Sequence, residues 1–309
     1  MKNLTFGIMG FLVVILTNNG CFGATIYVDQ SGGGDYTTVE AGINAAFPGD
    51  TVKVGPGVYQ VTVTINKDIN LMGSGPKYTT IQASSDGIIL TAGINTEITN
   101  FTITSGGYGI NASGNNITCT VRNCVIVGCG SSGIYYRKGD PYFTVTNNTI
   151  AYNGGDGLYI HDQYSDGKGY INIQGNIIVY NEGDGLDLYS DGHNYENISC
   201  NNVFANAVDY NPDTLKRPSD ISFDPLFIDK NAGNYALQST SHCIDSGIPG
   251  ESFNDPDGTR NDMGAFSGPP SAAFWPYISR GPAVTEITLT PASVPRGGTI
   301  TIQAKGRVQ

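Results

Sequence analysis

The sequence predicts an all-β fold, a right-handed parallel β-helix with a short cap helix at its start. A six-residue segment recurs at residues 98–103, 121–126, 145–150, 173–178 and 198–203, with starting positions 23, 24, 28 and 25 residues apart. Each copy ends in a β-branched residue. Glycine is abundant, with 42 residues, and separates short stretches rich in Val, Ile and Thr, which is typical of brief strands joined by turns.

A second marker supports the same period. A glycine followed by an aliphatic residue stands at Gly109-Ile110, Gly133-Ile134, Gly157-Leu158 and Gly185-Leu186. A unit of this size cannot bury its own apolar face, whereas stacked units bury it between parallel sheets. We therefore expect a solenoid of about nine coils. The fourth position of the recurring segment is Asn148, Asn176 and Asn201 in three consecutive coils, and we expect these amides to form a structural hydrogen-bonded column.

Residues 1–23 are expected to be an export signal. Lys2 precedes an apolar core from Phe6 to Leu16 that is too short to span a bilayer. Gly23 and Ala24 are small enough for cleavage nearby. Lipidation of Cys21 is the less favoured alternative. No later segment is expected to cross a membrane.

A short helix is expected to cover the first coil. Thr37 or Thr38 is placed to cap a helix over residues 39–46, and Pro48-Gly49 is placed to end it. Val39, Ile43 and Ala46 would face the coil.

Two stretches carry a resemblance to known proteins. Residues 25–81, which begin TIYVDQSGGGDYTTVEAGINAA, resemble the opening of pectin methylesterases and related pectate-lyase-like β-helix proteins. Residues 224–247 (DPLFIDKNAGNYALQSTSHCIDSG) and 255–266 (DPDGTRNDMGAF) resemble the closing segment of bacterial secreted β-helix proteins of the choice-of-anchor Q type. The resemblance implies a secreted β-helix and a closing turn in which Arg260 pairs with an aspartate. It implies no single reaction, because the superfamily holds lyases, hydrolases, esterases, epimerases and proteins without known activity.

The catalytic motifs of three of those enzyme groups are not found. The methylesterase segments with two aspartates and an arginine are missing, and so is the DPH motif of mannuronan epimerases. The arginine segment of pectate lyases has its nearest match in Lys216-Arg217-Pro218, which lacks the second arginine.

The domain plan follows from these boundaries. After the signal, residues 24–268 form the β-helix and residues 269–283 a proline-rich linker. Residues 284–309 alternate in polarity and are similar to the beginning of a bacterial immunoglobulin-like module. Two or three strands are too few to close a sandwich, so we expect a truncated module.

Charge and cysteine content narrow the partners. The formal net charge is −11 and no basic run stands out, so nucleic acid is not an expected partner. Five cysteines follow the signal, at positions 119, 124, 129, 200 and 243. An odd number argues against a complete disulfide framework. The spacing also lacks zinc-site pairs, so we expect small buried hydrophobic residues.

The candidate site lies on the outward side of the second strand of each coil. Alternation predicts that Ile134, Tyr136, Leu158, Ile160, Leu186 and Leu188 point inward. One outward column is then Asn111, Tyr135, Tyr159 and Asp187, and the next is Arg137, His161 and Tyr189. Tyr108, Ser132, Asp156 and Asp184 precede the glycines.

This face has the composition of a carbohydrate groove. Tyr135, Tyr159 and Tyr189 are the expected sugar-stacking residues, aided by Lys168 from the following loop. Asp156, Asp184 and Asp187 offer the oxygen ligands that suit Ca²⁺. For a lyase, His161 or Arg137 is the candidate base and Tyr159 the candidate acid. A glycoside hydrolase would instead use two of the carboxylates. Solenoid exteriors also need polar residues for solubility alone, and Gly-Asp-Gly is common in turns.

Three hypotheses about function stay open. The leading one is a secreted or cell-surface monomer that binds, and in one form processes, extracellular polysaccharide. The second is a structural or adhesive surface protein in which the solenoid is a rigid spacer. The third, a calcium-dependent polyuronate lyase, is a sharper form of the first. Walls formed by residues 137–142 and 162–169 would favour sugar binding.

Overall fold

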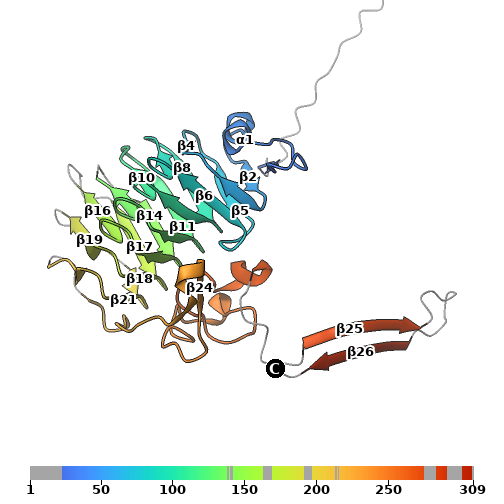
Figure 1. Ribbon diagram of the computed structural model, residues 1–309. Coiled ribbons are helices and arrows are strands. Elements are labelled where there is room, and N and C mark those ends of the chain that lie inside the picture. The colour runs from blue at the N-terminus through green and yellow to red at the C-terminus, as the bar shows by residue number, and fades with distance from the viewer. Residues whose placement is uncertain are drawn as a thin grey trace, which may run out of the picture.

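The protein is described from a computed structural model. It describes residues 23–274, except 138, 140–141, 163–168, 191–196, 213 and 215, together with residues 283–290 and 301–307. Within these residues the chain forms seven stacked coils of three strands each, preceded by one leading strand (Figure 1). The expectation of nine coils is wrong, because the chain after Tyr210 folds into irregular closing structure instead of further coils.

Each coil contributes one strand to each of three parallel sheets. Sheet A contains β1 (Thr25–Val28), β2 (Thr51–Val54), β5 (Asn70–Gly73), β8 (Asn95–Thr99), β11 (Thr118–Arg122), β14 (Tyr142–Thr146), β17 (Tyr170–Gln174) and β20 (Asn197–Ser199). Sheet B contains β3 (Gly57–Tyr59), β6 (Thr79–Ala83), β9 (Thr102–Ser105), β12 (Val125–Val127), β15 (Thr149–Ala151), β18 (Ile177–Val179) and β21 (Asn202–Phe204). Sheet C contains β4 (Val63–Ile65), β7 (Ile88–Leu90), β10 (Ile110–Ala112), β13 (Ile134–Tyr136), β16 (Leu158–Asp162), β19 (Asp184–Ser190) and β22 (Val208–Tyr210).

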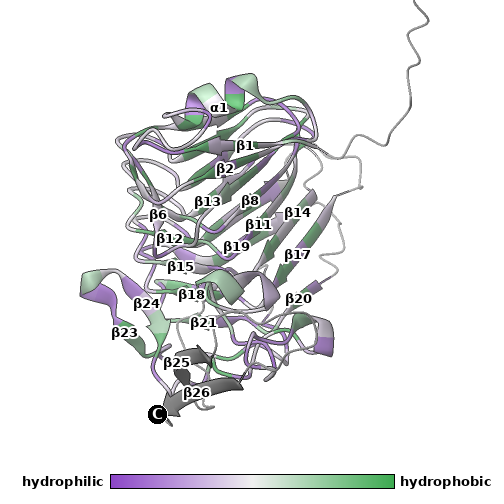
Figure 2. Cartoon of the chain, turned by 90° about the vertical axis from the view of Figure 1, so that its right-hand side faces the viewer, coloured by the Kyte–Doolittle hydropathy of each residue, from purple (hydrophilic) through white to green (hydrophobic). Residues whose placement is uncertain are grey.

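The core is the space enclosed by the three sheets. Equivalent residues lie over one another, so that Ile134 pairs with Leu158 and Leu158 with Leu186. All six residues predicted to point inward from sheet C are fully buried. Figure 2 shows the stack from another side, with hydrophobic segments, in green, along the strands and α1 across the top. The predicted alternation is therefore confirmed in sheet C.

A left-handed residue makes the sharp turn from sheet A to sheet B in consecutive coils. These residues have φ between 51° and 67° and are Asn100, Asn123, Asn147, Gly175 and Cys200. Asparagine and glycine tolerate this conformation better than other residues. The turn explains why the recurring segment in the sequence has Asn or Gly at its third position in most copies.

The predicted asparagine column follows directly after these turns. Asn148 donates from its backbone N and its Nδ2 to Oδ1 of Asn176, at 2.9 and 3.1 Å. Asn176 bonds to Asn201 in the same way, at 3.1 and 3.0 Å. All three side chains are fully buried. We call this column the first asparagine ladder, and its prediction is confirmed.

A second ladder, at the turn from sheet B to sheet C, was not predicted. Asn153 donates to Oδ1 of Asn181, and Asn181 to Oδ1 of Asn206, each from both nitrogens. Cys124 and Cys129 stand one coil earlier, where their backbone N–H groups donate to Asn148 and Asn153. The two cysteines therefore begin the two ladders.

A cap helix covers the N-terminal end of the solenoid, as predicted. Helix α1 spans Val39–Ala45, and the Thr38 side chain accepts a hydrogen bond from the N–H of Ala41. Val39, Ile43 and Ala46 are buried in the main core. The helix thus covers apolar surface that the first coil would otherwise expose.

Residues 216–274 form what we call the closing segment. It contains β23 (Phe227–Asp229), η1 (Lys230–Ala232), β24 (Asn234–Leu237), η2 (Glu251–Phe253) and η3 (Pro269–Ala273). Arg260 does not pair with an aspartate as expected. Its guanidinium donates to the carbonyl oxygen of Gly247 at 2.6 Å. Asp255 and Asp262 are buried and accept backbone N–H groups instead.

Strands β25 (Ala283–Thr290) and β26 (Thr301–Arg307) form an antiparallel pair. The immunoglobulin-like assignment of this region stays a prediction, as does the choice-of-anchor Q assignment of the closing segment. The export signal, including Cys21, lies outside the described residues.

Candidate functional site

The predicted site residues lie on the outer face of sheet C in two neighbouring columns. Register pairs Asn111 with Tyr135, Tyr135 with Tyr159, and Tyr159 with Asp187. In the next column His161 pairs with Tyr189, and Arg137 follows directly after β13. We call this face, comprising Arg137, Tyr135, Tyr159, His161, Asp187 and Tyr189, the sheet C strip.

The aromatic rings of the strip stack on one another. Ring centres lie 4.3 Å apart for Tyr108 and Tyr135, 5.0 Å for Tyr135 and Tyr159, and 3.8 Å for Tyr159 and His161. His161 and Tyr189 are tilted, with centres 5.6 Å apart. Because the inner rings cover one another's faces, they present edges to a ligand and not the flat faces expected from the sequence. Tyr189 is 39% exposed, more than the other rings of the strip.

His161 and Asp187 form an ion pair within the strip. Nε2 of His161 lies 2.9 Å from Oδ1 of Asp187, and the two side chains are 18% and 13% exposed. The carboxylate lies beside the imidazole ring, so the pair can position His161 for proton transfer.

The carboxylates Asp156 and Asp184 are joined to each other through the backbone. Oδ1 of Asp156 accepts the N–H of Asp184 at 2.7 Å, and Oδ2 of Asp184 accepts Nδ2 of Asn211 at 3.1 Å. Burial raises the pKa of Asp156, and the charges of Asp187 and Asp184 raise it further. The carboxylates are thus engaged in the packing of the turn.

The predicted Ca²⁺ site gains no support from this geometry. Among the residues that the structure describes, no group of three or more His, Cys, Asp or Glu side chains is arranged to hold a metal ion. Asp156, Asp184 and Asp187, the predicted ligands, therefore do not form such a group.

Part of the loops beside the strip lies outside the described residues. Lys168, predicted to bind substrate, lies outside the described residues, as does most of the predicted wall at 162–169.

Burial raises the pKa of Tyr159, and the nearby positive charge of Arg137 opposes this effect. Tyr159 is therefore a weaker acid than an exposed tyrosine, so its role as a general acid remains a prediction.

A cleft that the sequence analysis missed lies on the outer face of sheet A. Its floor is formed by hydroxyl and amide side chains of β11, β14 and β17, and its wall by the closing segment. The floor could have been noticed from the polar outward positions of those strands. The wall comes from residues 248–270, far along the chain from the floor, and no local sequence pattern predicts that the two meet.

The chain belongs to the right-handed β-helix region family, in agreement with its fold. The model of that family matches residues 70–243. A curated relative, the cell surface glycoprotein of Methanothermus fervidus, is 28% identical over 188 residues. That match covers 50% of this chain and 31% of the relative, so the chain spans about a third of the relative's length. The crystal structure of pectate lyase Pel9A is similar in fold, with 12% identity and a TM-score of 0.40, covering 79% of this chain and 97% of that chain.

No helix in the described part of the chain combines the length and the apolar character that crossing a bilayer requires.

Proposed function

We propose that this chain is a secreted or cell-surface β-helix protein that binds extracellular polysaccharide along the sheet C strip. The observation that carries the proposal is the alignment of tyrosine, histidine and carboxylate side chains over consecutive coils. A linear polymer can lie along such a strip and repeat the same contacts. The name of the curated relative, a cell surface glycoprotein, supports a surface location.

The chemistry of the strip suits sugar hydroxyls. Tyrosine hydroxyls both donate and accept hydrogen bonds, and the carboxylate of Asp187 only accepts them. The exposed ring of Tyr189 can pack against the apolar face of a sugar. Arg137, which is exposed, adds a positive charge that favours an acidic polymer.

A catalytic form of this proposal rests on the ion pair of His161 and Asp187. In a polyuronate lyase, His161 would remove the proton beside the carboxylate of the sugar, with Asp187 stabilising the imidazolium. Arg137 would stabilise the charge that develops on the substrate.

The ring stack itself favours a second candidate, the rigid spacer. Stacked rings and two asparagine ladders stiffen the solenoid without requiring any ligand. In this case Tyr189 would be a packing residue and the strip would bind no polymer.

The test is a retention assay of the purified mature protein on a panel of immobilised neutral and acidic polysaccharides. We expect retention on at least one polymer, and we expect Tyr189→Ala to weaken it while Tyr142→Ala does not. Tyr142 is a matched control because it is 42% exposed and lies on sheet A. Absence of retention on every polymer would favour the spacer.

The same samples test catalysis. The ultraviolet absorbance of unsaturated uronate is followed with and without Ca²⁺, in the native protein and in His161→Ala. A signal that disappears in the variant would establish a lyase, and retention without any signal would establish binding alone.

A further inference from the structure

We propose that the cleft between sheet A and the closing segment is a separate binding site for an uncharged oligosaccharide. It lies on a different sheet from the sheet C strip, and the inference does not depend on that strip. It rests on the shape of the cleft, on the polar atoms that line it and on the charge of the cavity that Glu97 and Arg122 line.

The cleft consists of two cavities that share a wall. The first has a volume of about 450 Å³, and the second of about 340 Å³. Arg122 and Pro270 line both. One outward column of sheet A, in register from strand to strand, supplies residues to both floors: Lys53, Met72, Thr99, Arg122, Thr146 and Gln174.

The cleft is long enough to hold a chain of several sugar units, because its floor crosses several strands of sheet A. The column from β2 to β17 crosses six strands, and with neighbouring strands about 4.8 Å apart it extends over about 24 Å. A single monosaccharide would fill only a small part of it.

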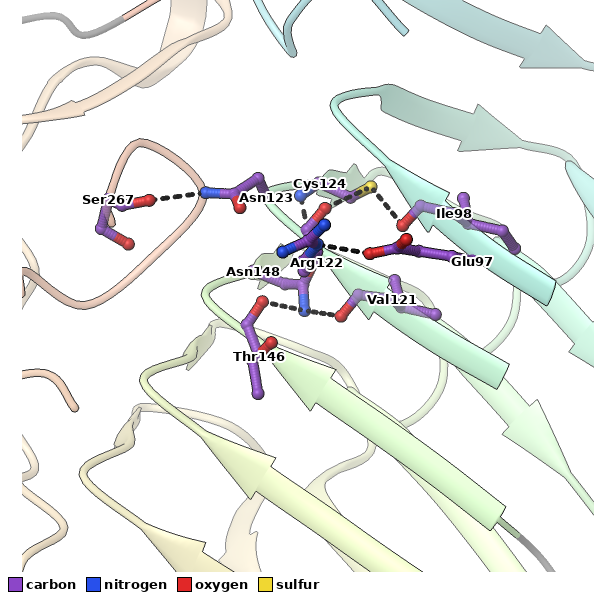
Figure 3. Close-up of polar contacts among 9 residues, drawn as sticks. All are labelled: Glu97, Ile98, Val121, Arg122, Asn123, Cys124, Thr146, Asn148 and Ser267. Atoms are coloured by element: carbon purple, nitrogen blue, oxygen red, sulfur yellow. Dashed lines mark hydrogen bonds and ion pairs between the residues drawn. The ribbon is translucent and has the colours of Figure 1, made fainter. Parts of the chain in front are cut away.

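The wall is firmly attached to the floor. Nδ2 of Asn123 donates to the carbonyl oxygens of Ala265 and Ser267, at 3.1 and 2.7 Å (Figure 3). Nδ2 of Asn147 donates to Oδ1 of Asn261 and to Oγ of Ser267, at 2.9 and 2.6 Å. Both donors are the left-handed asparagines of the turn between sheets A and B. The cleft is therefore part of the folded structure, and its residues keep fixed positions.

Several buried polar atoms of this cleft make no hydrogen bond. Among the described residues, those that line it are Thr99 Oγ1, Asn100 Oδ1, Asn172 Oδ1, Asn261 Nδ2 and Arg122 Nε, the last of which is in the ion pair with Glu97. Buried polar groups are nearly always paired, so these atoms point to a ligand or to water. Asn261 is fully buried, and its other amide atom, Oδ1, accepts from Asn147 and from the backbone N of Ile248. Its Nδ2 is thus an available donor, and Asn172 Oδ1 is an available acceptor in the lining of the same cavity.

The charge of the first cavity favours a neutral ligand. Among the described residues, the charged ones that line it are Glu97 and Arg122, which form an ion pair with each other (Figure 3). Thr120, Thr144 and Thr146 contribute hydroxyl groups. Phe253, which is 44% exposed, adds an aromatic ring at the wall. Hydroxyls and amides beside an aromatic ring match the groups and the apolar face of a sugar, whereas an anionic polymer would have to compete with Glu97.

The test measures binding by isothermal titration calorimetry with cellohexaose, mannohexaose, xylohexaose and hexagalacturonate. We expect at least one of the neutral hexasaccharides to bind more tightly than hexagalacturonate. Asn172→Ala and Phe253→Ala should each weaken that binding by about tenfold. Asn172→Ala removes an atom without a partner, so its unfolding midpoint should stay close to that of the native protein.

Two controls separate this site from the sheet C strip. Asn95→Ala changes an exposed asparagine on the outer face of β8 that lines neither cavity, and it should leave the affinity unchanged, as should Tyr189→Ala. Loss of binding in Tyr189→Ala alone would place the ligand on the strip and overturn the proposal. Binding by none of the neutral sugars, or stronger binding of hexagalacturonate, would also overturn it.

Discussion

Asp220 ends the first asparagine ladder by accepting two hydrogen bonds from Asn201. Its Oδ1 lies 2.9 Å from the backbone N of Asn201 and 3.3 Å from its Nδ2. Its Oδ2 lies 3.2 Å from the hydroxyl of Tyr210 and from the backbone N of Arg217. A ladder in which each amide donates to the next coil needs only an acceptor at its end, and a carboxylate is an acceptor at both oxygens.

Asp220→Asn should therefore destabilise the protein. The new amide has one acceptor oxygen, and its NH₂ group would face the N–H of either Asn201 or Arg217. We expect a loss of about 1–3 kcal/mol in the free energy of unfolding, measured by chemical denaturation. The exposed Asp229→Asn is the control, and a similar change in both variants would contradict this account of the ladder.

Cys124→Asn should extend the first ladder by one coil. The Cys124 Sγ lies near the carbonyl oxygens of Ile98 and Arg122 (Figure 3), just as Nδ2 of Asn148 donates to those of Val121 and Thr146. An asparagine at position 124 finds the same acceptors. We expect a gain of about 1 kcal/mol in the free energy of unfolding.

Cys119→Asn is the matched comparison for that variant. Cys119 is 1% exposed and packs in the apolar core, so its amide would be buried without partners, at a cost of about 2–3 kcal/mol. Equal destabilisation by the two substitutions would show that position 124 is not a ladder position.

The buried thiols should be unreactive in the native protein. Burial raises the pKa of Cys124 to about 12 and that of Cys129 to about 11, so little of the reactive thiolate forms at neutral pH. Mass spectrometry after treatment with iodoacetamide should find both residues unmodified in native protein and modified in denaturant. Rapid native labelling of either one would indicate local opening of its coil.

The stability of the closing segment should fall as pH rises. Burial raises the pKa of Asp262, and the charges of Asp255 and Asp245 add to this effect. In the unfolded chain the same carboxyl titrates near its ordinary value, about 3.9. Between the two values the folded protein binds more protons than the unfolded chain. The stabilisation that Asp262 contributes is therefore complete at a pH below its pKa in the unfolded chain. It is lost as the pH rises through its raised pKa in the folded protein.

Asp262→Asn tests that pH dependence. The amide oxygen can still accept the N–H of Asp245, which lies 2.7 Å from Oδ1 in the native protein, but the side chain cannot ionise. The protection of the backbone amides of residues 245–268 against hydrogen exchange, relative to the unfolded chain, should depend less on pH in the variant. It is measured from acidic to weakly alkaline pH. The exposed Asp257→Asn should keep the native profile, and an unchanged profile in Asp262→Asn would rule out this carboxyl as the cause.

Much of the fold could be predicted from the sequence, because every coil needs the same types of residue at its turns and inward positions. Asn148, Asn176 and Asn201 could be aligned since each follows a left-handed residue and stands two positions before a buried β-branched aliphatic one. The second ladder was equally periodic, at Asn153, Asn181 and Asn206, and went unnoticed because its neighbours vary more. Extending either column back by 24 residues reaches Cys124 and Cys129, whose place in the ladders could have been found this way.

The candidate sites were less accessible to such reasoning. The columns of the sheet C strip followed from alternation, but the stacking of Tyr135 on Tyr159 depends on side-chain rotation, which alternation does not specify. The cleft on sheet A depends on Asn123 meeting Ser267 across 144 residues of sequence. Contacts of that kind depend on how the closing segment folds back onto sheet A, and no repeating pattern in the sequence marks them.

The ladders also give the solenoid a polarity. Every internal asparagine accepts from the coil before it and donates to the coil after it, so each internal coil presents acceptors on one side and matching donors on the other. Only the ends are special, with a cysteine at the start of each ladder and Asp220 or Asp209 at the finish. Duplication or deletion of a whole internal coil would thus leave every junction chemically intact. The length of such a protein can change in evolution by one coil at a time, while its two ends are kept.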